Sequence, residues 1–61
     1  MPTIAITAEL LQTLITAAYE AEAICTYDAE QADDDEEAAG HRRRAEDYAR
    51  AQREAIALLP A

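Results

Sequence analysis

The chain has 61 residues and a formal net charge of −8, from 13 acidic side chains against five arginines. A surface this acidic argues against direct binding to nucleic-acid backbones or anionic membranes, because both attract positive charge. The single cysteine excludes an internal disulfide, and no apolar run approaches the ~20 residues of a membrane-spanning helix.

Apolar residues make up 51% of the chain, but most of them are alanine, and Phe and Trp are absent. A domain this small buries only about 60% of its unfolded surface, so one copy with so few large side chains would be marginally stable. We therefore expect a single domain that assembles with further copies of itself. Residues 1–6 lack the basic start of a signal peptide, so the expected location is cytoplasmic.

Residues 2–6 alternate in polarity but are too short a run for a sheet, so residues 1–7 are predicted to form an extended arm. Thr7 suits the N-cap position and Glu9 the first turn, which predicts a first helix over residues 8–31. At about 100° per residue, the inner face of this helix is predicted to contain Leu11, Leu14, Ala18, Ala21, Cys25 and Ala32, with Leu10 and Ile15 beside it.

An acidic run, residues 33–37, separates two alanine-rich segments of similar length. Asp33 and Asp34 are good N-caps, which predicts a turn over residues 32–34 and a second helix over residues 35–59, ending before Pro60. A turn at Gly40 is the alternative, but its two helices would be too unequal to cover each other. Gly40 then lies inside the second helix at a cost of about 1 kcal/mol relative to Ala, which suggests that a close contact requires it.

The predicted fold is all-α, an antiparallel two-helix hairpin that assembles into a homo-oligomeric helical bundle. Small side chains line the middle of this hairpin, and the large aliphatic side chains gather at its open end, opposite the turn. We expect copies to meet at this end. The predicted interface consists of Ile4, Ile6, Leu10, Leu14, Ile15, Ile56, Leu58 and Leu59.

Residues 41–44 hold the only concentrated positive charge of the chain. Arg43 and Arg50 are predicted to point outward and to form i,i+4 ion pairs, namely Arg43 with Asp47, Glu46 with Arg50, and Arg50 with Glu54. Arg42 and Arg44 are predicted to flank the inner face from opposite sides, where their planar groups could bind phosphate, with Tyr27 or Tyr48 stacking on a base. The candidate ligand-binding residues are Tyr27, His41, Arg42, Arg44 and Tyr48. The alternative role of Arg42 and Arg44 is to neutralise Asp28 and the acidic turn.

Cys25, Asp28 and His41 are expected to approach one another, a combination that can support nucleophilic catalysis. Two alanine-faced helices offer neither a cleft nor oxyanion donors, so no catalytic residue is predicted. Paired metal ligands at helical spacing are also missing, so we expect no metal and no cofactor. His41 is expected to bind a carboxylate. The predicted mode of action is binding without catalysis.

Residues 44–47 (Arg-Ala-Glu-Asp) and 53–57 (Arg-Glu-Ala-Ile-Ala) together resemble the second helix of the hairpin domain in phage anti-defence sponges. The chain departs from that pattern at Ala45, where the family favours Leu, and at Ala51, near the family's Trp. Such sponges suppress CBASS and Thoeris immunity by sequestering cyclic-nucleotide signals. The resemblance implies that this chain oligomerises and sequesters a phosphorylated small molecule, a nucleotide immune signal.

Two other functions are compatible with the sequence. The acidic end of the hairpin, residues 33–37, could imitate nucleic acid and block a basic surface of a host protein. The chain could also be a structural subunit of an assembly, without any ligand.

Overall fold

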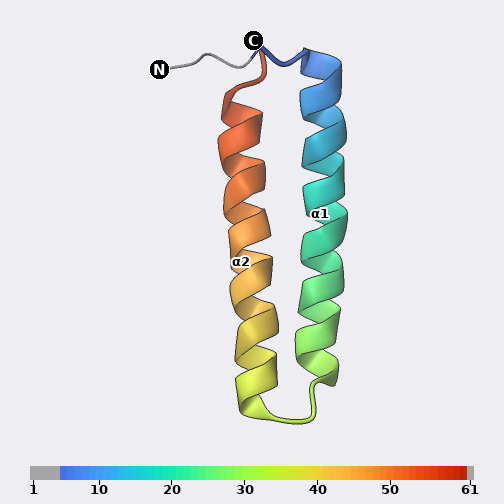
Figure 1. Ribbon diagram of the computed structural model, residues 1–61, viewed down its shortest axis with the longest axis vertical. Helices are drawn as coiled ribbons and strands as arrows, with labels where there is room; N and C mark the ends of the chain where they lie inside the picture. Colours follow the sequence, from blue (N-terminus) through green and yellow to red (C-terminus); the bar gives the residue numbers. More distant parts are fainter. Residues whose placement is uncertain (1–4, 61) are drawn as a thin grey trace.

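The structure is a computed structural model that describes residues 5–60. It contains two helices, α1 (Ala8–Gln31) and α2 (Asp35–Ala57), which pack against each other in antiparallel directions and are joined by a short turn (Figure 1). The predicted helical hairpin is therefore confirmed. Ile4 and most of the predicted arm lie outside the described residues, while residues 5–7 are irregular.

Both helices begin at the predicted caps. Thr7 Oγ1 accepts a hydrogen bond from the amide of Leu10 at 3.0 Å, and Asp34 Oδ1 accepts one from the amide of Glu37 at 2.7 Å. Each bond satisfies an amide of the first turn that has no partner within its helix. Asp34 is therefore the N-cap of α2, while Asp33 lies in the turn before it.

The turn needs no unusual backbone conformation. Ala32 and Asp34 are both extended, and no residue from 5 to 60 has a positive φ angle. Glycine is therefore not required at this turn.

α2 ends two residues earlier than predicted, at Ala57 instead of Leu59. The amides of Leu58 and Leu59 donate to the carbonyls three residues before them, Ala55 and Ile56, at 3.0 and 3.1 Å, which is the tighter bonding of a final turn. Pro60 explains the early end, because a proline disfavours the helical conformation of the residue before it.

The helices meet along a stripe of mostly small side chains, spaced three or four residues apart. We call it the inner stripe, and its members are Leu11, Ile15, Ala18, Glu22, Cys25 and Ala29 of α1 with Ala38, His41, Ala45, Ala49 and Gln52 of α2, all buried or half-buried. In α1 the steps alternate between four and three, which is the repeat of a two-helix coiled coil, whereas α2 has two successive steps of four, from His41 to Ala45 and from Ala45 to Ala49. Small side chains allow the two backbones to approach closely along this stripe.

Leu14 does not belong to the inner stripe, contrary to the prediction. Its side chain is 49% exposed, whereas Ile15 is half-buried and Ala29, missed by the prediction, is buried. Leu11 and Ala29 are five helical turns apart and face the same way, and Leu14 is rotated by about 60° from that direction. A single neighbouring helix covers only a narrow stripe and leaves Leu14 outside it.

Gly40 has no packing role within one hairpin, contrary to expectation. A methyl group built at its Cα would meet no atom within 4 Å. No helix in the described part of the chain combines the length and the apolar character needed to cross a membrane.

We expect Asp34→Ala to lower the free energy of unfolding by about 1 kcal/mol, because the Glu37 amide would lose its side-chain acceptor. Urea unfolding followed by circular dichroism measures this loss. Asp33→Ala is the matched control, since it removes the same charge next to the cap and should cost clearly less. Equal losses for the two variants would contradict the assignment of Asp34 as the cap.

We expect Ala38→Leu to lower the free energy of unfolding by roughly 1–3 kcal/mol, because the larger side chain forces the helices apart. Ala39→Leu adds the same atoms at the neighbouring exposed position and should change stability little. Thermal unfolding of both variants provides the comparison, and an unchanged melting temperature for Ala38→Leu would show that the helices are not closely packed there.

Candidate functional site

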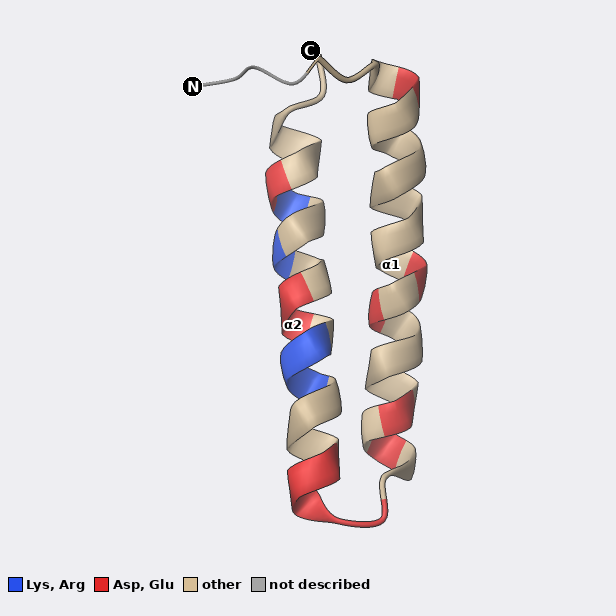
Figure 2. Cartoon of the chain, viewed as in Figure 1, with Lys and Arg blue, Asp and Glu red and all other residues tan. Residues whose placement is uncertain are grey.

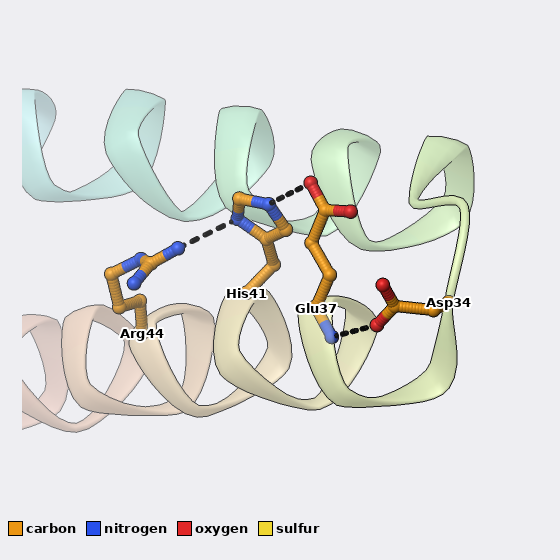
Figure 3. Close-up of polar contacts among 4 residues, drawn as sticks. All are labelled: Asp34, Glu37, His41 and Arg44. Atoms are coloured by element: carbon orange, nitrogen blue, oxygen red, sulfur yellow. Dashed lines mark hydrogen bonds and ion pairs between the residues drawn. The ribbon is translucent and has the colours of Figure 1, made fainter.

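Three polar side chains form a line along α2 beside α1 (Figure 3). Arg44 Nη2 lies 2.9 Å from His41 Nδ1, and His41 Nε2 lies 3.9 Å from Glu37 Oε1. Arginine can only donate, so Nδ1 of His41 accepts, and a neutral imidazole then carries its proton on Nε2, toward Glu37. The carboxylate expected beside His41 is therefore Glu37, at a distance too long for a hydrogen bond.

Arg44 and Arg50 have different partners. Arg50 Nη2 contacts Asp47 Oδ1 at 2.9 Å, an exposed i,i+3 pair. For residues 5–60, no carboxylate lies within 4.0 Å of Arg44 or of the other three arginines. Arg44 is therefore oriented by a neutral ring and keeps its positive charge available to an anion.

The i,i+4 ion pairs predicted for Arg43 and Arg50 are not formed, because Arg50 binds Asp47 instead. The described residues also contain no ion pair between Asp28 and Arg42 or Arg44, so the neutralising role considered for these arginines is not observed. Of the arginines, only Arg50 reaches a carboxylate in the described residues, and that carboxylate, Asp47, lies on its own helix.

The candidate ligand-binding residues do not all come together. Tyr48 follows Arg44 by four residues and shares its side of α2, whereas Arg42 is rotated from Arg44 by about 160° around the helix axis. Tyr27 is exposed and lies about half a turn from the inner stripe of α1, so it points away from α2. The structure thus groups His41, Arg44 and Tyr48, without Tyr27 and Arg42.

Cys25, Asp28 and His41 form no hydrogen bond with one another in the described part of the chain. Cys25 is half-buried in the inner stripe, as expected for a small apolar side chain. Residues 5–60 contain no group of three or more His, Cys, Asp or Glu side chains suited to a metal ion.

A shallow pocket lies at the open end of the hairpin, away from Arg44. Its volume is about 410 Å³, and its lining is formed by Ala5, Ile6, Ala8, Leu11, Leu58 and Pro60. Ile6 and Leu58, two members of the predicted interface, are exposed beside it, whereas Ile15 and Leu59 are half-buried. The residues that line this pocket are all uncharged, whereas acidic residues surround the turn at the other end and the arginines occupy the middle and later part of α2 (Figure 2).

The contact between His41 and Arg44 was not predicted. Its only signal in the sequence is the i,i+3 spacing, which places two side chains on one face of a helix. Comparisons with protein-family models, curated proteins and solved structures give no match to this chain.

Proposed function

We propose that this chain acts by binding, without catalysis, as a homo-oligomer that sequesters a phosphorylated small molecule, a nucleotide signal. The observation that carries this proposal is Arg44, whose guanidinium is oriented by His41 and has no carboxylate partner in the described residues. An arginine fixed in this way can offer its remaining N–H groups to a phosphate, and Tyr48 on the same side of α2 offers a ring to a base.

Oligomerisation supports this function in two ways. Leu11 is the only large apolar side chain buried in the described part of one hairpin, while Leu10, Leu14 and Ile24 remain about half exposed or more. Contact between copies would cover these side chains. It would also bring several copies of Arg44 together, which offsets the repulsion between an anionic ligand and a chain of charge −8.

We expect native mass spectrometry of protein from cells that make immune nucleotides to show an oligomer with a nucleotide-sized adduct. Arg44→Ala should lose the adduct, because the phosphate loses its guanidinium. Arg43→Ala is the matched control: it removes the same charge from an outward position and should keep the adduct. Retention by Arg44→Ala, or equal loss in both variants, would overturn the assignment of Arg44.

A second candidate function is inhibition of a protein with a basic surface, through the acidic end of the hairpin. The observation that favours it is that residues 33–37 are five consecutive carboxylates, all exposed. Within the described residues their nearest basic side chain is His41, at 3.9 Å from Glu37. The acidic end is therefore available to an external cationic surface.

The triple variant Asp33→Asn, Asp35→Asn, Glu36→Gln separates the two functions while keeping the cap Asp34. We expect it to retain the small-molecule adduct, since none of the three residues is near Arg44. If the chain is instead an acidic inhibitor, the same variant should lose a protein partner captured by the unmodified chain in pull-down, and Arg44→Ala should still capture it.

A further inference from the structure

One broad face of the hairpin carries large and small apolar side chains that the hairpin itself does not cover. We call it the apolar face, and its members are Leu10, Leu14, Ala17, Ala21 and Ile24 of α1 with Tyr48, Ala51, Ala55 and Leu58 of α2, of which only Ala21 and Ala55 are half-buried. Nearer the turn, the same side of the hairpin also carries the charged residues Asp28, Glu37 and Arg44. Those of α1 each precede a member of the inner stripe by one residue, so α1 has a second coiled-coil stripe beside the first.

The two helices contribute to the same face because of their symmetry. Antiparallel helices are related by a two-fold axis perpendicular to the plane of the hairpin, so positions just before the inner stripe lie on one side in both. Positions just after it form the opposite face, which is polar. The opposite face holds Gln12, Thr16, Tyr19, Ala23, Thr26 and Glu30 of α1 with Ala39, Arg42, Glu46, Arg50 and Arg53 of α2.

We propose that the apolar face packs against the same face of a second copy, with the two turns at opposite ends, to give a four-helix bundle. This inference rests on the oligomeric part of the proposed function, and it places two residues of the candidate ligand site, Arg44 and Tyr48, at the contact between copies. It differs from the interface predicted from the sequence, because contact runs along the hairpin and does not stop at the open end.

Surface area supports a partner on this scale. The chain exposes 5051 Å², compared with about 3900 Å² for a compact protein of 6.7 kDa. Part of the difference comes from exposed residues at the chain ends, such as Ile6 and Leu58. An interface of ordinary size covers about 800 Å² on each partner, which is comparable to the excess exposed area that the chain ends do not explain.

The apolar face is complementary to itself. Let α2 of a second copy run antiparallel to α2 of the first, with the two-fold axis passing between Tyr48 and Ala51. Tyr48 of one copy then lies opposite Ala51 of the other, Arg44 opposite Ala55, and Gly40 opposite Leu58. The same axis places Leu14 near Ala21 of the other α1. In these pairs a large side chain meets a small one, which is the pattern that fills an interface without voids, while Leu10 comes near Ile24 of the other α1 and Arg44 brings a charge to the contact. This self-complementarity identifies a second copy as the occupant.

Gly40 gains a role in this arrangement. Inside one hairpin its missing side chain leaves open space, so the helix accepts a cost of about 1 kcal/mol without any internal contact that needs it. Opposite Leu58 of another copy, the absence of a side chain makes room for a leucine.

Electrostatics favours turns at opposite ends. The turn and the start of α2 together carry five consecutive carboxylates, residues 33–37, and the structure extends 42 Å along its longest axis. Charges screened over a Debye length of about 8 Å do not repel across that distance, whereas turns placed together would.

Sedimentation equilibrium of ligand-free protein tests the interface. We expect the unmodified chain to have about twice the mass of 6.7 kDa, and Ile24→Glu to raise the dimer dissociation constant at least about tenfold, since it places a carboxylate in an apolar contact. Tyr19→Glu is the matched control, because Tyr19 (63% exposed) and Ile24 (62%) are equally accessible but lie on opposite faces. Equal weakening by both variants would overturn the proposal.

Two further experiments separate assembly from folding and fix the orientation. Gly40→Leu should weaken the dimer without lowering the helicity of the monomer, because leucine favours helix more than glycine. In a Cys25→Ala background, Ala17→Cys lies close to the two-fold axis and should form a disulfide between copies on oxidation, while Thr16→Cys on the opposite face should not. Absence of the Ala17→Cys disulfide would overturn the antiparallel arrangement.

The outcomes distinguish this proposal from the proposed function. A monomeric unmodified chain would overturn both. An oligomer that is insensitive to Ile24→Glu and Gly40→Leu would overturn the apolar face alone, and a dimer with the expected sensitivities but no nucleotide adduct would overturn the ligand alone.

Discussion

Close approach of two helices along small side chains is the constraint on which this structure depends. Alanine recurs in the inner stripe, so many backbone contacts form but each buries little area, and Leu11 is the one large apolar side chain that becomes buried in the described residues. The hairpin consequently keeps most of its large apolar surface exposed. The exposed apolar face and the predicted need for further copies have this common physical cause.

Local signals predicted the helix starts better than the helix faces. Thr7 and Asp34 cap α1 and α2 as expected, because a cap depends on only a few neighbouring residues. Leu14 was assigned wrongly because a helical wheel shows which residues share a direction, but not how wide a stripe the second helix covers. The end of α2 was placed two residues late because proline acts already on the residue before it.

The polar contacts of α2 were less predictable. Arg50 could pair with Glu46, Asp47 or Glu54 by spacing, and the choice of Asp47 depends on side-chain rotamers that a sequence pattern does not contain. The contact of Arg44 with His41 likewise depends on side-chain rotamers. By contrast, the separation of Arg42 from Arg44 follows from helical geometry alone and was predicted. The predicted grouping of Tyr27 with these arginines does not hold, because Tyr27 lies on the side of α1 that faces away from α2.

The three-residue turn also has a consequence for the order of folding. Contacts between α1 and α2 are nested around this turn, so those beside it close the shortest loops and those at the open end close the longest. Because the entropy cost of closure grows with loop length, the helices are expected to associate first near Ala29 and Ala38 and to zip toward Leu11. The hairpin would therefore fold from its acidic end toward its aliphatic end, and the large side chains would pack last.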